Sequence, residues 1–322
     1  MSNTGIAIHG GAGTILKKNM TSEMEAAYKS ALETALNAGW RILQAGGSAL
    51  DAVDAAVTEM ELNPLFNAGK GSVFTNEGII EMDASIMHGA NITAGAVAAV
   101  RNIKHPVKLA RAVMEKSQFV MLSGKGAEEF AKLNGIETAP DEYFFTQRRY
   151  DQLQKAIESG AAFLDHTTDF SKKETSSPDE AGNKKFGTVG AVALDADGNL
   201  AAATSTGGMT NKKFGRIGDT AIIGAGTYAE NQVAAVSCTG DGEFFIRQSV
   251  AYDLISLMKY KDFTLEEAAN YTIFNNLNSI KGEGGLIAID SDGNIEMPFN
   301  SEGMYRAAIS NSLPMRIEIY KE

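Results

Sequence analysis

The sequence contains a single cysteine, Cys238, among 322 residues. One thiol cannot form an intramolecular disulfide, and it cannot build a zinc site that needs several cysteines. We therefore expect a protein of a reducing compartment. The amino-terminal residues show neither the basic segment nor the apolar segment of a secretory signal, so a cytoplasmic location fits best.

Long hydrophobic runs and clusters of basic residues are also scarce. No apolar stretch approaches the roughly 18 residues that a membrane-spanning helix needs, so we expect no membrane association. The net charge of -11, from 29 Lys+Arg against 40 Asp+Glu, disfavours a phosphate backbone or an anionic membrane surface as the main partner. We expect no nucleic-acid partner.

Histidine is limited to four residues, all before Thr167: His9, His88, His105 and His166. No pair of them has the spacing of a helical zinc site, so we do not expect a catalytic zinc ion. A Ser-His-Asp triad would have to take its base from the first half, and no spacing indicates one. We interpret each histidine as structural.

Apolar residues, by contrast, make up 44% of the chain, and 33 glycines indicate many turns. Strand and helix patterns come in blocks without strict alternation, which predicts an α+β protein with largely antiparallel sheets and helices packed on them. Before residue 165 we predict strands at 4–14, 79–87 and 94–100, helices at 21–47, 48–62, 106–117, 124–135 and 141–160, and a structured loop at 63–78. After residue 187 we predict two strands within 188–206, further strands at 220–226 and 233–244, helices at 243–260 and 264–274, and a hairpin at 284–299.

The stretch from Thr167 to Lys185 is polar and charged, and only Phe170 and Ala181 in it are apolar. Such a segment cannot offset its ordering entropy by burying apolar surface. We predict a mobile linker at about 165–187.

A glycine-rich turn at residues 9–13, HGGAG, could bind a phosphate or form an oxyanion loop. Neither reading is complete. The dinucleotide fingerprint lacks its third glycine, and the stretch closest to a nucleophile elbow, at 203–207, lacks its first glycine.

The pair Gly187-Thr188 stands where the linker meets a buried strand. A hydroxyl needs a base to become a nucleophile, and the α-amino group of an amino-terminal threonine can be that base. Its pKa of roughly 7.7 to 8.0 leaves a neutral fraction near pH 7. Gly187, without a Cβ, leaves its carbonyl open to attack by the Thr188 hydroxyl. The alternative is an ordinary strand start.

Two further groups could bind an amino acid. Arg216 and Asp219 could hold a carboxylate and an ammonium, or could form a local salt bridge in their loop. Thr239, Gly240 and Gly242 occupy a turn at a strand end, where backbone N–H groups could meet an oxyanion or only close the turn.

Four segments, 6–13, 63–75, 187–231 and 235–243, together resemble the plant-type L-asparaginases, also called isoaspartyl peptidases, of the N-terminal-nucleophile hydrolase superfamily. The resemblance covers nearly the whole chain in order. It implies a single domain, 1–322, with a four-layer αββα sandwich in which two mainly antiparallel sheets lie between helical layers. It also implies cleavage at Gly187-Thr188 into an α subunit, 1–187, and a β subunit, 188–322, and a homodimer of such αβ units.

The resemblance assigns a role to each site residue. Thr188 matches the nucleophile and Thr206 the threonine that orients it, while Thr239 and Gly240 match the oxyanion hole. Arg216 and Asp219 match the groups that hold the substrate α-carboxylate and α-ammonium, with Gly240, Gly242 and Asn67 nearby. No catalytic cofactor is implied, but a structural sodium ion is, held mainly by backbone carbonyls of Met60, Glu61, Asn63, Phe66, Ala68 and Lys70.

The implied activity is hydrolysis of the side-chain amide of L-asparagine and of β-aspartyl dipeptides through a threonyl acyl-enzyme. Two alternatives stay open. One is an amidase of the glycosylasparaginase type, which shares the cut site. The other is an uncleaved amino-acid-binding protein without catalysis.

Overall fold

The computed structural model describes residues 3–158 and 187–321. The predicted linker at about 165–187 lies outside the described residues, apart from Gly187. The helices are α1 (Ser22–Gln44), α2 (Ala49–Leu62), α3 (Pro106–Lys116), α4 (Gly124–Leu133), α5 (Asp141–Phe144), α6 (Gln147–Glu158), α7 (Gly242–Gln248), α8 (Val250–Lys261) and α9 (Leu265–Asn270). Short 3-10 turns, η1 (Lys17–Asn19) and η2 (Gly69–Gly71), and a π-helical segment, η4 (Tyr271–Leu277), complete the helical elements.

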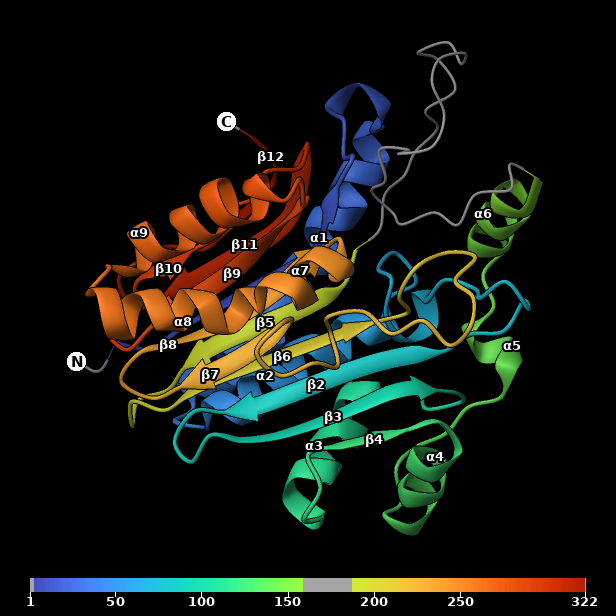
Figure 1. Ribbon diagram of the computed structural model, residues 1–322, viewed down its shortest axis with the longest axis horizontal. Helices are drawn as coiled ribbons and strands as arrows, with labels where there is room; N and C mark the ends of the chain where they lie inside the picture. The colour runs from blue at the N-terminus through green and yellow to red at the C-terminus, as the bar shows by residue number, and fades with distance from the viewer. Residues whose placement is uncertain (1–2, 159–186, 322) are drawn as a thin grey trace.

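The strands form two sheets (Figure 1). The eight-stranded sheet contains, in spatial order, β12 (Arg316–Tyr320), β11 (Gly303–Ser310), β1 (Gly5–Gly13), β5 (Val189–Leu194), β6 (Leu200–Thr206), β2 (Met82–His88), β3 (Thr93–Val100) and β4 (Met121–Ser123). The four-stranded sheet contains β10 (Ile295–Glu296), β9 (Gly284–Asp290), β8 (Ala234–Gly240) and β7 (Thr227–Glu230). Neighbouring strands are antiparallel except β3 and β4. The predicted α+β class with two sheets and helices is confirmed.

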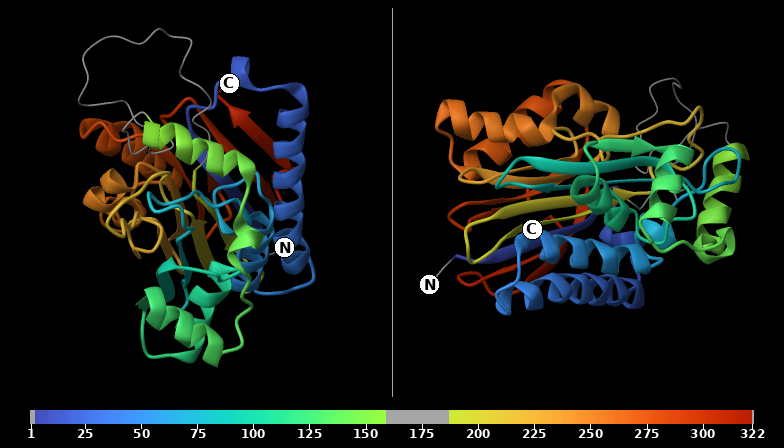
Figure 2. Two further views of the ribbon diagram at one scale, coloured as in Figure 1. Left: turned by 90° about the vertical axis from the view of Figure 1, so that its right-hand side faces the viewer. Right: turned by 90° about the horizontal axis from the view of Figure 1, so that it is seen from below.

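Alternating side chains place apolar residues on both faces of the eight-stranded sheet. In β1, Ile6 and Ile8 pack with residues of α1, α2 and α3 on one face. Ala7 of the same strand packs with residues of β8 and β9 on the other face, so the two sheets lie face to face. A third apolar cluster joins the outer face of the four-stranded sheet to α8 and α9 (Figure 2). The start of β5 and the end of β6 therefore lie deep inside the molecule.

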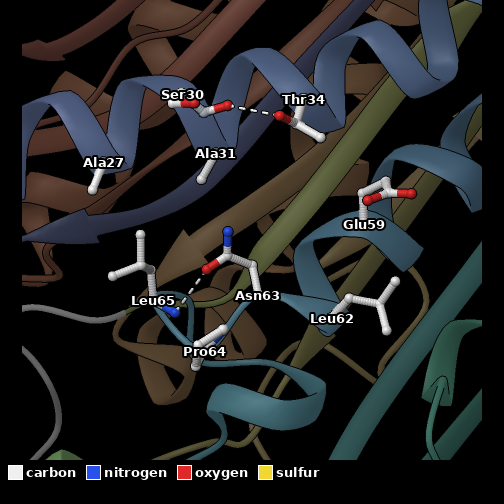
Figure 3. Close-up of a pocket in the computed structure, with 9 residues that line it drawn as sticks. All are labelled: Ala27, Ser30, Ala31, Thr34, Glu59, Leu62, Asn63, Pro64 and Leu65. Atoms are coloured by element: carbon white, nitrogen blue, oxygen red, sulfur yellow. Dashed lines mark hydrogen bonds between the residues drawn. The ribbon is translucent and has the colours of Figure 1, made fainter.

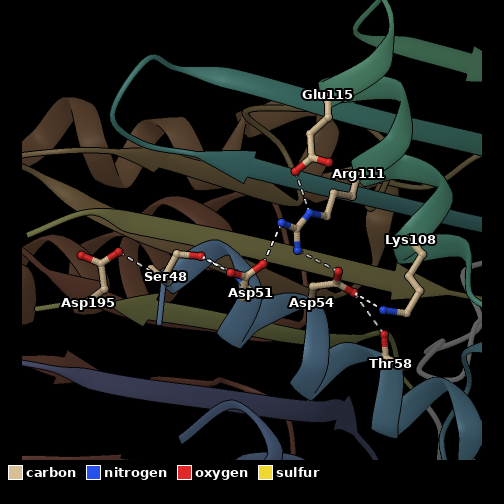
Figure 4. A network of polar contacts seen from close by, with 9 residues as sticks. Ser48, Asp51, Asp54, Thr58, Lys108, Arg111, Glu115 and Asp195 are labelled. Carbon is tan, nitrogen blue, oxygen red and sulfur yellow. Dashed lines mark hydrogen bonds and ion pairs between the residues drawn. The ribbon is translucent and has the colours of Figure 1, made fainter. Parts of the chain in front are cut away.

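Helix α2 is held at its amino terminus and along its exposed side. The Ser48 hydroxyl accepts a hydrogen bond from the Asp51 N–H at 3.1 Å and so caps the helix. Arg111 of α3 forms ion pairs with Asp51 at 2.7 Å and Asp54 at 3.0 Å (Figure 4). The Ala49 N–H donates to Asp195, directly after β5, at 2.9 Å. These contacts fix α2 against the strand that starts at the predicted cut.

Two predicted helices are interrupted in the structure. The predicted helix at 141–160 breaks at Phe145, which has extended backbone angles and whose ring contacts the rings of Phe74 and Tyr150. The predicted helix at 243–260 breaks at Ser249, which has a φ of 50°. Here the N–H groups of Ala251 and Tyr252 donate to carbonyls of the loop before β7, so long-range hydrogen bonds restart the helix.

Other boundaries also differ from the prediction. The predicted strand at 220–226 is a series of turns, and the strand starts at Thr227. The predicted helix at 264–274 becomes π-helical after Asn270. Strands β4, β11 and β12 were not predicted. In the described parts of the chain, no helix is both long and apolar enough to cross a membrane.

Candidate active site

Thr188 and Thr206 lie at the adjoining ends of β5 and β6. Val189 stands opposite Ser205 in the antiparallel register, and continuing that register by one residue sets Thr188 opposite Thr206. Both threonines are nearly fully buried. Because side chains alternate along a strand and Val192 and Ala202 contact the four-stranded sheet, both hydroxyls lie on the face between the sheets.

The Gly187-Thr188 peptide lies against Thr239 and against the HGGAG residues. The predicted turn at 9–13 is wrong, because these residues form the end of strand β1, with a bulge between His9 and Gly11. A Cβ on Gly187 would lie only 2.7 Å from the Thr239 hydroxyl oxygen, and a Cβ on Gly11 would lie 2.5 Å from the Gly187 nitrogen. The same Thr239 oxygen accepts a hydrogen bond from the Ala12 N–H at 3.3 Å. The structure thus brings Thr239 next to the peptide bond before Thr188. The backbone of Gly11 and Ala12 lies beside the same peptide bond.

Arg216, Asp219 and Gly242 come together at the end of β8. A Cβ on Gly242 would lie 2.9 Å from Asp219 Oδ1 and 3.0 Å from Arg216 Nη2. Gly240, two residues earlier, has a φ of 154° and follows Thr239 directly. Therefore Thr239, Gly240 and Gly242 lie on one turn between the Thr188 peptide and the Arg216-Asp219 pair.

The Asp219 carboxylate is buried beside Arg216. It is 4% exposed, and among the residues that the structure describes its Oδ2 has no hydrogen-bond partner. Burial raises the pKa of Asp219 to about 7, against the opposing effect of the Arg216 guanidinium. A buried carboxylate oxygen without a donor suits an incoming ammonium group.

Arg216 does not pair directly with Asp219 but with Glu243, a residue that sequence reasoning missed. Arg216 Nε donates to Glu243 Oε1 at 2.8 Å and Nη2 donates to Oε2 at 2.7 Å. This two-pronged pair uses one edge of the guanidinium, which has five N–H groups in all. A substrate carboxylate could then take the Nη1 edge. The only signal in the sequence is the position of Glu243 directly after Gly242.

More charged groups surround this site than the sequence indicated. Asp83 of β2 stands opposite Thr206 in the sheet register and is fully buried, which raises its pKa. Lys212 is 3% exposed and donates to the Glu81 carbonyl at 3.0 Å. Burial lowers the pKa of Lys212, and Asp83 counters part of that effect. Asp241 is also largely buried, and burial together with the Glu243 carboxylate raises its pKa to about 7.

Asn67 supports the turn that follows Thr206. Its Nδ2 donates to the Gly208 carbonyl at 2.8 Å, and its Oδ1 accepts from the Val73 N–H at 3.0 Å. The Thr206 hydroxyl in turn accepts from the Gly208 N–H at 3.0 Å. Asn67 thus lies next to the Thr206 turn, and its part in substrate binding stays a prediction.

In the loop predicted to hold sodium, backbone carbonyls pack against Gly69 and Gly71. A Cβ on Gly69 would lie 2.2 Å from the Glu61 carbonyl oxygen, and a Cβ on Gly71 would lie 2.0 Å from that of Phe66. The Lys70 ammonium lies over the Tyr143 ring, 5.3 Å from its centroid. Carbonyl oxygens are the kind of ligand that a hard cation prefers, and the sodium site stays a prediction. In the described residues no three His, Cys, Asp or Glu side chains form a metal site.

A separate groove of about 440 Å³ lies between α1 and the segment 59–65, outside the cluster around Thr188 (Figure 3). Its walls include Ala27, Thr34, Leu62 and Pro64. Of the residues predicted from the sequence, only Asn63 lines it, so it is not the predicted substrate site.

Known proteins match this chain over nearly its whole length. The family model described as "Asparaginase" matches residues 2–317. The isoaspartyl peptidase of Escherichia coli strain K12 is 51% identical over 308 residues, covering 95% of this chain and 93% of that protein. The isoaspartyl peptidase/L-asparaginase of Mus musculus is 44% identical over 95% of this chain and 88% of that protein. The probable isoaspartyl peptidase/L-asparaginase 2 of Arabidopsis thaliana is 39% identical over the full length of both chains. With a family match over almost all of its residues and relatives at this level of identity, the chain belongs to the asparaginase family.

Proposed function

We propose that this protein hydrolyses the side-chain amide of L-asparagine and of β-aspartyl dipeptides, with Thr188 as its nucleophile. The observation that carries the proposal is the grouping of Thr188, Thr206 and Thr239 beside an arginine and a buried carboxylate, Asp219, whose Oδ2 has no hydrogen-bond partner in the described part of the chain. The names of the relatives support the same substrates. In fold terms, the two face-to-face sheets with helices on their outer faces support the four-layer αββα sandwich of N-terminal-nucleophile hydrolases.

Maturation comes first in this proposal. The Thr188 hydroxyl attacks the Gly187 carbonyl carbon, and the peptide nitrogen leaves as the free α-amino group of Thr188. Water then hydrolyses the resulting ester, which releases the Gly187 carboxylate and restores the Thr188 hydroxyl. The contacts of Gly187 with Gly11 and with the Thr239 hydroxyl leave no room for a side chain at this position. The products are an α subunit, 1–187, and a β subunit, 188–322.

Turnover then uses the new amino terminus. The α-amino group accepts the proton of the Thr188 hydroxyl, whose oxygen attacks the side-chain amide carbon of the substrate. The oxyanion is stabilised by Thr239 and Gly240, and the amine carries the proton to the departing ammonia or amino acid. Water then hydrolyses the aspartyl ester and releases aspartate. Thr206, opposite Thr188 in the sheet, orients the hydroxyl.

Selectivity for the β-linkage follows from the charges around Gly242. Arg216 takes the substrate α-carboxylate on the guanidinium edge that Glu243 does not use, and Asp219 takes the α-ammonium. Within an ordinary α-peptide the residue has neither free group, so binding it would leave Asp219 and the free edge of Arg216 unsatisfied, at a cost of several kcal/mol.

The proposal also includes a bound sodium ion, a homodimer and a reducing compartment. The carbonyls near Gly69 and Gly71 would hold a structural sodium ion that stiffens the loop before Ser72. The mature αβ units would pair as a homodimer. The single cysteine, Cys238, is buried and free, which supports a reducing compartment such as the cytoplasm.

The test is intact mass followed by kinetics on one preparation. We expect the purified 34.2 kDa chain to convert into two fragments that end and begin at Gly187 and Thr188, and the product to hydrolyse L-asparagine and β-aspartyl dipeptides. Thr188→Ala should abolish both events. A chain that stays intact, binds aspartate and turns over nothing would instead support the amino-acid-binding alternative. Faster hydrolysis of a glycosylated asparagine would support the glycosylasparaginase alternative.

Arg216→Ala tests the carboxylate site separately from the nucleophile. Because a buried charge contact is lost, we expect KM to rise at least about 30-fold while cleavage continues. The control is Arg247→Ala, which removes an exposed arginine from the same helix as Glu243. An unchanged KM in the Arg216 variant would contradict the assignment.

A further inference from the structure

A row of polar side chains crosses the core between the two sheets. The next row on one side is apolar, and the next row on the other side contains Thr188, Thr206 and Asp83 of the candidate active site. In the eight-stranded sheet the register aligns one residue from each of β1, β5, β6 and β2, which are His9, Gly190, Thr204 and Ser85. In the facing sheet Thr227 stands opposite Ser237. The five side chains of these rows are 0% exposed. Such a buried polar row requires internal hydrogen bonds to offset its desolvation.

Gly190 creates the space in which the two rows meet. A Cβ at this position would lie 2.0 Å from the Ser237 hydroxyl oxygen and 2.5 Å from His9 Nε2. The imidazole of β1 can therefore reach across β5 to the other sheet. No other residue type would leave this path open.

The row forms a continuous series of polar contacts with the site at both ends. His9 Nδ1 lies 3.0 Å from the Thr188 carbonyl oxygen, and His9 Nε2 lies 2.9 Å from the Ser237 hydroxyl. The next links are Ser237 to Thr204 at 2.7 Å, Thr204 to Thr227, Thr227 to Ser85 at 2.8 Å, and Ser85 to the Thr220 carbonyl at 2.6 Å. Thr220 directly follows Asp219, the residue proposed to hold the substrate ammonium.

The two terminal carbonyls determine the direction of donation. A carbonyl only accepts, so His9 Nδ1–H donates to Thr188 and the Ser85 hydroxyl donates to Thr220. Complete burial lowers the pKa of His9 to about 3, so the ring is neutral and Nε2 accepts from Ser237.

The chain then has fewer protons than contacts. It has one proton on the neutral imidazole and one on each of four hydroxyls. These protons serve six contacts between the two terminal carbonyls and two longer contacts of 3.3 Å, from Thr204 to the Gly226 carbonyl and from Ser237 to the Ala203 carbonyl. Donation must reverse once, in the part between Ser237 and Ser85. In the half that contains His9, hydrogen bonds are donated in the direction of the Thr188 carbonyl. In the half that contains Ser85, they are donated in the direction of the Thr220 carbonyl, so the two halves are independent.

We propose that this buried chain contains two positioning residues that act on opposite ends of the active site: His9 sets the backbone of the nucleophile, and Ser85 sets the backbone next to the ammonium-binding carboxylate. The inference rests on the proposed function, because it takes Thr188 and Asp219 as the working groups. Neither His9 nor Ser85 touches the substrate, so each acts only through its carbonyl partner.

Two amide replacements of His9 separate its two nitrogen atoms. In His9→Asn the side-chain nitrogen can take the place of Nδ1 and keep the bond to Thr188, whereas in His9→Gln the amide reaches the place of Nε2 and keeps only Ser237. We expect His9→Gln to lower kcat for L-asparagine at least about tenfold, with KM within about twofold, because the nucleophile is displaced. His9→Asn should retain kcat within about threefold of the wild type.

Ser85→Ala tests the other end of the chain. It leaves the Thr220 carbonyl without this donor, so we expect KM to rise at least about fivefold while kcat stays within about twofold. Because donation reverses between the halves, the double variant His9→Gln/Ser85→Ala should show the two effects multiplied, without coupling. Melting temperatures of all variants accompany the kinetics.

Several outcomes would overturn the inference: equal kcat in the Asn and Gln variants, a Ser85→Ala variant in which kcat falls in place of a KM increase, or losses that only follow the melting temperature. If His9→Gln gives no soluble protein, the other two variants decide. Loss of kcat in His9→Asn, or an unchanged KM in Ser85→Ala, would then contradict the inference. Failure of the proposed function looks different, because the wild-type chain itself would then show no cleavage or hydrolysis.

Discussion

At the scale of single residues, the burial of Asp219 makes substrate capture dependent on pH. Only the ionised carboxylate attracts an ammonium group, and burial raises the pKa of Asp219 to about 7. Below that pH the Asp219 carboxyl group is mostly neutral, while Arg216 keeps its positive charge. Capture of an α-amino acid should therefore weaken on acidification, while capture of a plain carboxylate should not.

We predict that the inhibition constant of L-aspartate rises by up to about tenfold for each pH unit below 7, because binding then requires loss of the Asp219 proton. Steady-state inhibition between pH 5 and 8 measures it without relying on the ionisation of the catalytic amine. Succinate, which has no ammonium group, is the control, and its inhibition constant should lack this rise. A flat profile for L-aspartate would contradict the role of Asp219.

Residues with charges or hydroxyls differ in how far the sequence alone predicts them. The sequence alone indicates Gly187-Thr188, because the pair stands where a polar segment meets a buried strand. It also indicates Arg216 and Asp219, because they lie close together in one loop, and the structure groups both with Gly242. Glu243, Asp83 and Lys212 are ordinary in the sequence, because their partners lie on other elements. His9 was interpreted as structural, and its complete burial agrees with that reading.

At the scale of helices and strands, end signals were reliable where they are local. Thr21 and Ser48 each accept a hydrogen bond from the backbone three residues on, and the predicted starts of α1 and α2 are confirmed. The interruption at Ser249 carries no such signal. It depends on acceptors in the loop at 224–225, which the helix meets only in the folded molecule.

Helix α8 ends at a residue with left-handed backbone angles. Asp262, the exposed C-cap residue, has left-handed backbone angles of 55° and 29°, which disfavour residues with a Cβ. We predict that Asp262→Gly raises the free energy of unfolding by about 0.5 to 1 kcal/mol without changing activity. Thermal or urea unfolding of the protein measures it.

Asp262→Asn is the matched control. It removes the negative charge from the helix C-terminus but keeps a side chain, so any gain of the glycine variant beyond the asparagine variant comes from the backbone. Equal stability of the two variants would mean that charge, and not left-handed strain, limits this helix end.

At the scale of the whole molecule, the eight-stranded sheet mixes the two parts of the chain on either side of the predicted cut. Strand β1 lies between β11 and β5, and β2 lies next to β6 (Figure 1). The first part supplies β1 to β4, and the second part supplies β5, β6, β11 and β12. Each part alone would expose unpaired strand edges and an uncovered apolar face.

We predict that neither fragment 1–187 nor fragment 188–322 folds when expressed alone, because both lack central neighbours in the sheet. Circular dichroism and solubility of each fragment measure this. Co-expression of the two fragments should restore a soluble protein with the melting behaviour of the single chain. A cooperative melting transition in either lone fragment would contradict the prediction.

The sequence by itself determined the features that depend on near neighbours: the capped helices α1 and α2, the β5-β6 hairpin at the Asp-Gly turn, and the unusual Gly187-Thr188 pair. Only the tertiary structure decided that β11 lies beside β1, that Glu243 pairs with Arg216, and that His9 reaches Ser237. The reason is physical. Caps and turns are made by groups a few residues apart, whereas sheet order and buried hydrogen bonds join residues separated by hundreds of positions, and their geometry exists only once the two sheets have packed.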